Sequence, residues 1–123
     1  MNKSVLDIWG RKFELNAIFE CYPGEEILDN QRIALEQIRG PGIVDEALDS
    51  VKKYIANTAE SQIDLPIDNI FKFVMPKSLF VPHNKKSPQI AIMCDYKFDA
   101  EHGIAIVFVD GRLKEVGIQD IIL

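Results

Sequence analysis

Apolar and polar residues alternate along residues 12–21, which is the pattern of a β-strand with one buried face. The apolar positions of this run are Phe13, Leu15, Ala17, Phe19 and Cys21. A shorter β-prone run covers residues 5–8, and Trp9-Gly10 separates the two runs. Pro23-Gly24 ends the second run. The pattern therefore predicts an N-terminal β-hairpin that carries Cys21 on its buried face.

Between residues 27 and 55 the apolar spacing changes to the 3.6-residue period of an amphipathic helix. The first set is Ile27, Leu28, Leu35 and Ile38, and the second is Val44, Ala47, Leu48, Val51, Tyr54 and Ile55. Acidic residues begin both segments, where negative charge complements the helix dipole. Because Gly40-Pro41-Gly42 is a short break, the two segments predict an antiparallel helical hairpin.

Four more β-strands are predicted in the second half of the chain. Residues 71–81 are mostly apolar, and Pro76 among them indicates an edge position or a bulge, since proline cannot donate to a strand ladder. Residues 90–98 alternate again, and residues 104–109 are apolar on both faces, as in a central strand. The hairpin turn Asp110-Gly111 then leads into a return strand.

Together these patterns predict one α+β domain over residues 1–123. We expect an N-terminal β-hairpin, a two-helix hairpin and then an antiparallel β-meander, with the helices on one face of the sheet. The chain has 123 residues, 47% of them hydrophobic and 27% charged, as in an ordinary globular domain. A domain of this size folds without disulfides or a metal.

The composition also favours a cytoplasmic protein with no membrane partner. No window is apolar over the roughly 18 residues that a membrane span needs. Asp7 interrupts the N-terminal segment, so it does not resemble a hydrophobic signal sequence. Cys21 and Cys94 both fall at apolar strand positions, and we expect two buried free thiols.

Titratable side chains are concentrated in residues 93–103, where any active site should lie. Asp95, Asp99, Glu101 and His102 offer metal ligands, and Asp95, Asp99 and His102 offer the groups of a hydrolase. Against both readings, Lys97 falls between Asp95 and Asp99 on the same face of the predicted strand and would balance their charge. We therefore expect a solvated or partner-facing surface, without a metal, a cofactor or a catalytic residue.

Other catalytic signals are weak. His83 lies in a predicted loop beside Lys85 and Lys86, where we expect a solvated side chain. The serines lie in no Gly-x-Ser-x-Gly context, and the glycines lack the spacing and the lysine of a phosphate-binding loop. The sequence therefore does not predict an enzyme.

Charge is unevenly distributed along the chain. Residues 25–68 contain ten acidic and four basic residues, a net charge of −6, whereas the whole chain carries −5. Residues 72–97 contain five lysines and one aspartate, a net charge of +4. The acidic helices are either simply solvated or form a surface that steers a basic partner towards it. An acidic chain is poorly suited to collecting phosphates, so we expect no direct nucleic-acid binding.

Several segments are similar to a known group of proteins. They are Gly10-Arg11-Lys12-Phe13, Cys21-Tyr22-Pro23-Gly24-Glu25-Glu26, Val74-Met75-Pro76-Lys77-Ser78-Leu79-Phe80, residues 93–103 and the closing Val116-Gly117-Ile118-Gln119-Asp120-Ile121-Ile122-Leu123. Over nearly the whole chain they resemble a family of small, uncharacterised bacterial cytoplasmic domains. Some of those domains look like immunity proteins, which protect a cell from the polymorphic toxins of its neighbours. The resemblance implies binding and supplies no catalytic residues.

The leading hypothesis is a non-enzymatic protein-binding domain, in its most concrete form an immunity protein that binds a basic, nuclease-type toxin. Its candidate binding residues are Glu25, Glu26, Asp29, Glu36, Asp45, Glu46 and Asp49, and a second candidate surface is Asp95, Lys97 and Asp99. The alternatives are an interaction or housekeeping domain without a toxin partner and, less favoured, the hydrolase. The sequence does not predict an oligomeric state.

Overall fold

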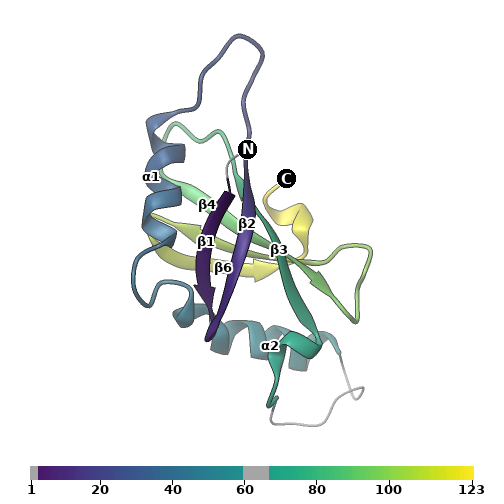
Figure 1. Ribbon diagram of the computed structural model, residues 1–123. Coiled ribbons are helices and arrows are strands. Elements are labelled where there is room, and N and C mark those ends of the chain that lie inside the picture. Colours follow the sequence, from purple (N-terminus) through teal and green to yellow (C-terminus); the bar gives the residue numbers. More distant parts are fainter. Residues whose placement is uncertain (1–2, 60–66) are drawn as a thin grey trace.

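The computed structural model describes residues 3–59 and 67–123, and these form one six-stranded sheet with two helices (Figure 1). The strands are β1 (Lys3–Ile8), β2 (Arg11–Phe19), β3 (Val74–Val81), β4 (Gln89–Tyr96), β5 (Ile104–Val109) and β6 (Arg112–Gly117). The helices are α1 (Asp29–Ile38) and α2 (Leu48–Thr58), with short 3-10 turns at Asp45–Ala47, Ile70–Lys72 and Gln119–Ile121. The α+β class and the N-terminal hairpin are confirmed.

Two hairpin turns form where the sequence predicts them. Trp9 and Gly10, between β1 and β2, have φ angles of 51° and 85°. Asp110 and Gly111, between β5 and β6, have φ angles of 54° and 77°. Two successive positive φ values match the right-handed twist of the flanking strands, which is why such turns close two-residue hairpins.

The predicted antiparallel meander is confirmed over β3, β4, β5 and β6, and β3 also joins it to the N-terminal hairpin. β3 runs parallel to β2, from Asn16 opposite Ser78 to Phe19 opposite Val81, and antiparallel to β4. A parallel pair needs a long crossover connection, and α1 and α2 both lie in it. β3 is therefore an inner strand, but its pairs with β2 begin at Ser78, so Pro76 is paired only with Cys94 of β4. The register shifts between Pro76 and Ser78, so the predicted bulge is confirmed.

The two helices are confirmed, but they are not packed side by side as an antiparallel hairpin. α1 runs along one side of the sheet, whereas α2 crosses near its end in another direction (Figure 1). Each helix buries its own apolar residues in the core that the strands line: Ala34 and Ile38 from α1, and Val51 and Ile55 from α2. Each helix therefore takes its direction from its packing against the sheet. The apolar surface that the sheet presents to each helix is larger than the one that the helices present to each other.

Side chains of the sheet join two separate apolar clusters. Alternate residues of β4, such as Ile90 and Ile92, belong to the main core with the helices. Ala91 and Met93, on the opposite face, form a smaller cluster with β5, against which Ile122 of the C-terminal segment packs. β5 is buried along nearly its whole length, as expected for a central strand. Within the described residues, no helix is both long and apolar enough to cross a lipid bilayer.

Candidate functional site

The segment that joins β2 to the start of α1 presents three of the predicted binding residues. We call residues 20–29 the acidic loop, because it contains Glu20, Glu25, Glu26 and Asp29. Glu25, Glu26 and Asp29 are exposed. Together with Arg32 and Lys85 they line a shallow depression of the surface. The loop is therefore a mainly negative rim above the end of the sheet.

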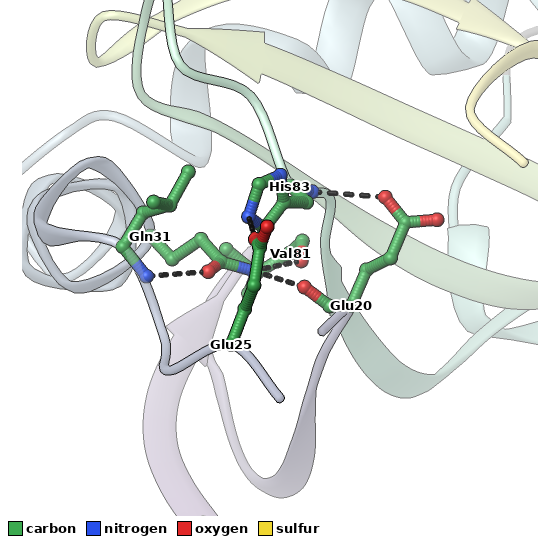
Figure 2. Close-up of polar contacts among 6 residues, drawn as sticks. Glu20, Glu25, Gln31, Val81 and His83 are labelled. Carbon is green, nitrogen blue, oxygen red and sulfur yellow. Dashed lines mark hydrogen bonds and ion pairs between the residues drawn. The ribbon is translucent and has the colours of Figure 1, made fainter. Parts of the chain in front are cut away.

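A buried glutamine anchors the acidic loop to the sheet. Gln31 is 1% exposed, and its Nε2 donates to the carbonyl oxygens of Glu20 and Val81 at 2.8 and 3.0 Å (Figure 2). Its Oε1 accepts from the backbone N–H of Leu28 at 2.8 Å. One amide thus connects the end of β2, the end of β3 and the start of α1. A buried side-chain amide with all these partners strongly restricts the backbone around it.

His83 forms the second anchor. Its side chain is only 3% exposed, and its Nε2 lies 2.9 Å from Oε2 of Glu25 (Figure 2). The backbone N–H of His83 donates to Oε1 of Glu20 at 2.9 Å. The ring centroid of Tyr22 lies 4.6 Å from that of His83. The prediction of a solvated His83 is wrong. Tyr22 and Glu25 of the acidic loop lie against its ring and shield it from solvent.

The contact between His83 and Glu25 is close but poorly aligned. The distance is that of an ion pair, yet Nε2 of His83 is a buried nitrogen without a hydrogen-bond partner within the described part of the chain. The two observations agree if the Glu25 oxygen lies off the direction of the ring N–H, since hydrogen bonds weaken steeply with angle. The contact is therefore a close approach of a carboxylate oxygen to a ring nitrogen and not a hydrogen bond.

The seven acidic residues predicted for binding do not form one surface. Glu25 and Glu26 precede α1 and Asp29 begins it, whereas Asp45 and Glu46 lie in the 3-10 turn before α2 and Asp49 in the first turn of α2. These two segments are at opposite ends of α1 (Figure 1). Between them, Glu36 lies 3.8 Å from Arg39. The predicted acidic residues therefore form two separate groups and not one acidic face along the helices.

The acidic and basic segments are less separated in the folded protein than they are along the sequence. Lys85, from the basic segment, lines the same depression as the acidic loop. Asp29 lies 3.4 Å from Arg32 on the next turn of α1, with both side chains exposed. Lys77 lies 3.7 Å from Asp95. Glu60 and Asp64, which contribute to the negative charge of residues 25–68, lie outside the described residues.

The second predicted surface, Asp95, Lys97 and Asp99, does not lie on one strand face. β4 ends at Tyr96, and the following residues form a turn in which Asp99 N–H donates to the Tyr96 carbonyl at 3.2 Å. Lys97 Nζ lies 5.8 Å from the ring centroids of both Phe73 and Phe98. The alternation of polar residues continues past the end of the strand, which is why the sequence prediction is wrong here.

The structure brings Asp99 and His102 together and leaves Asp95 beside Lys77. Nδ1 of His102 lies 3.0 and 3.1 Å from the two oxygens of Asp99. The hydrogen bond with Asp99, and then its charge, raise the pKa of His102, and the hydrogen bond with His102 lowers the pKa of Asp99. No cluster of three or more metal-ligating side chains occurs within residues 3–59 and 67–123.

The two thiols differ in environment. Cys94 is buried in the core, and burial raises the pKa of its thiol well above the ordinary value. Cys21 is exposed, which corrects the prediction of two buried cysteines. β2 ends at Phe19, so the alternation that places Cys21 on a buried face no longer applies there.

Sequence reasoning missed the two anchors of the acidic loop. Gln31 carried a signal, because it occupies the buried side of α1 with Ala34 and Ile38. A polar residue on an apolar helix face is usually held by specific hydrogen bonds. His83 carried no such signal, because its partners Glu20, Tyr22 and Glu25 are distant in sequence and only the parallel pairing of β2 with β3 brings them close.

Comparisons with known proteins give a family and no activity. A family model described as "Domain of unknown function (DUF6985)" matches residues 1–123. Neither the curated proteins nor the solved structures contain a match to the chain. The match confirms the prediction of an uncharacterised domain family, whereas the bacterial origin and the likeness to immunity proteins stay predictions.

Proposed function

We propose that this chain, which belongs to the DUF6985 family, is a non-enzymatic domain that binds a basic protein through the acidic loop. In its most specific form the proposal is an immunity protein that neutralises a nuclease-type toxin in the cytoplasm. One observation carries it: exposed carboxylates lie on a loop that a buried glutamine fixes to the sheet. Binding groups on loops that a rigid scaffold positions are a common arrangement in recognition proteins.

The physical argument is preorganisation. Glu26 and Asp29 are exposed, while Gln31 holds the backbone at Glu20 and Leu28, on either side of Glu26. A loop that is already ordered loses little conformational entropy when a partner binds. Tyr22, 52% exposed, adds an aromatic side chain to the same rim, and exposed tyrosines are common at the centres of protein interfaces.

The helices and the sheet act as the scaffold that supports the acidic loop. In this proposal the two helices cover one face of the sheet, since the buried residues of both belong to the main core. The loop then projects from the end of the covered layer. The net charge of −5 favours a basic protein over nucleic acid as the direct partner.

A second candidate function is an interaction domain without a toxin partner, and the other face of the sheet favours it. Ile18 is 53% exposed and pairs with Phe80, next to the smaller apolar cluster. A partner that docks there would be selected by apolar area more than by charge.

Replacing the loop carboxylates tests the proposal. The triple variant E25Q/E26Q/D29N removes three charges from the acidic loop, and the matched control D45N/E46Q/D49N removes three charges from the start of α2. Each chain is co-expressed with the protein encoded beside its gene, and complex formation and cell growth are measured. We expect the loop variant to bind at least about tenfold more weakly, because close charge pairs across interfaces contribute 1.5 kcal/mol or more.

The control variant should bind as the unchanged chain does, and complex formation should slow at high salt. Circular dichroism verifies that both variants are folded. Equal losses in the two variants would show that overall charge, and not the acidic loop, recognises the partner. A neighbouring protein that never forms a complex would exclude the immunity function, and a complex that both variants retain would favour the apolar sheet face.

A further inference from the structure

β1 is an edge strand whose outer backbone groups are unpaired within the described residues. The two-residue turn at Trp9-Gly10 makes Ile8 and Arg11 a pair that exchanges both backbone hydrogen bonds. The alternation of an antiparallel ladder then directs the N–H and C=O groups of Lys3, Val5 and Asp7 away from β2. Within residues 3–59 and 67–123, no backbone hydrogen bond joins these groups to another segment.

The segment that flanks this edge does not pair with its backbone. Residues 38–45 and β1 together line a surface pocket beside Val5 and Asp7. The hydrogen bonds between the two walls run through side chains: Arg39 donates to Oγ of Ser4 at 2.9 Å, and Trp9 Nε1 donates to the Val44 carbonyl at 3.1 Å. No backbone hydrogen bond joins the two walls within the described residues, so the outward groups of β1 are unpaired on this side.

The side chains of β1 complement a second β1 strand in the antiparallel direction. Lys3, Val5 and Asp7 are all exposed, and Val5 reaches 59%. If Val5 lies opposite Val5 of a second copy, each Lys3 lies opposite an Asp7. This register also pairs outward-facing backbone groups with each other. Opposite charges and β-branched pairs across an antiparallel ladder are both stabilising.

We propose that β1 pairs with β1 of a second copy of this chain, so that the two sheets join across a twofold axis at Val5. The contact is isologous, which is the commonest symmetry of protein dimers. It is independent of the acidic loop and of the proposed function.

The opposite edge of the sheet does not offer the same contact. β6 carries Arg112, Lys114 and Glu115, and all three are exposed. A twofold axis at Lys114 or at Glu115 places identical charges opposite each other, and an axis at Leu113 places Arg112 opposite Lys114. Like charges in direct opposition oppose pairing, and natural sheets protect their edges in this way. The complementary charges of β1 are therefore specific to that edge.

Sedimentation equilibrium over a range of concentrations tests the dimer. The mass of the unchanged chain should rise with concentration from 14.0 kDa towards twice that value. V5P removes the outward N–H at the centre of the contact without removing a bond to β2, so it should remain monomeric. The control V5T keeps the N–H and the branched side chain and should still dimerise.

Charge exchange tests the register of the pairing. Because Lys3 lies 3.4 Å from Glu14 and Asp7 lies opposite Lys12 on β2, circular dichroism first verifies that each variant is folded. D7K and K3D each place like charges opposite one another, and each should weaken the dimer roughly tenfold. The double variant K3D/D7K restores opposite charges in the same register and should recover dimerisation. An unchanged chain that stays at 14.0 kDa at every concentration would overturn the proposal, as would a dimer that V5P and D7K leave intact.

Discussion

Cysteine and histidine each occur twice in this protein, and in both cases the two side chains have opposite environments. Cys94 is in the core while Cys21 is exposed. The side chain of His83 is 3% exposed, whereas that of His102 is 44% exposed beside Asp99. Residue type alone therefore does not predict how reactive each cysteine or histidine is. The differences in exposure are large enough to produce measurable differences in reactivity and titration.

The two thiols should react with a maleimide at very different rates. In the folded protein Cys21 should be modified quickly and Cys94 should stay unmodified, because burial excludes the reagent and raises the pKa of the Cys94 thiol. Mass spectrometry should show one adduct in buffer and two in denaturant. The variant C21S should show none in buffer. Rapid double labelling of the folded chain would contradict the burial of Cys94.

The Asp99–His102 pair predicts a pH dependence. Asp99 raises the pKa of His102 above its ordinary 6.5, and His102 lowers the pKa of Asp99 below 3.8. A raised histidine pKa stabilises the fold fully below 6.5, and this contribution is lost as the pH rises through the folded-state pKa. A lowered carboxyl pKa stabilises the fold above 3.8, and this contribution is lost as the pH falls through the folded-state pKa. The pair therefore contributes most between these two values.

NMR titration of the imidazole protons measures this effect. D99N should return the pKa of His102 towards its ordinary value, because the variant removes the hydrogen-bonded carboxylate that favours the charged ring. D95N is the matched control, since Asp95 lies beside Lys77 and should leave His102 nearly unchanged. A His102 pKa that does not respond to D99N would show that the pair does not form in solution.

At the scale of elements, Gln31 joins three of them. It lies in the first turn of α1 and bonds to the carbonyls at the ends of β2 and β3. Its hydrogen bonds are also the reason that a polar residue is tolerated on the buried face of an otherwise amphipathic helix. The position of the acidic loop depends on this link.

Q31A should lower the free energy of unfolding by about 2–4 kcal/mol. The variant leaves the Leu28 N–H and the Glu20 carbonyl without the partner they have now, while the Val81 carbonyl keeps the Glu20 N–H. Each unsatisfied group costs about 1–3 kcal/mol before water compensates. Chemical denaturation measures the change. R32A, at an exposed position of the same helix, should change the stability by less than about 0.5 kcal/mol. Equal effects of the two variants would show that Gln31 is not an anchor.

Local elements followed from local sequence. The turn at Asp110-Gly111 and the strand over residues 104–109 formed as predicted, because turn chemistry and apolar runs act over a few residues. Element ends were less certain: the alternating pattern continued past Phe19 and past Tyr96, although the strands stop there. Cys21 and Asp99 were placed wrongly for that single reason.

At the scale of the whole molecule, the parallel pairing of β2 with β3 sets the remaining geometry. It makes the helices part of a crossover, makes β3 an inner strand and brings residues 20–29 beside His83. It also leaves β1 and β6 as the two edges. The acidic loop and the β1 edge, which carry the two proposals, both result from this arrangement.

The amino-acid sequence alone determined the α+β class, the first hairpin, the presence of two helices and the central strand. These depend on hydrophobic periodicity and turn residues, which are written in consecutive positions. Only the tertiary structure decided the pairing of β2 with β3, the burial of His83 and the separation of the acidic residues into two groups. Those features depend on contacts between residues far apart in the chain, and no local pattern encodes which distant segments meet.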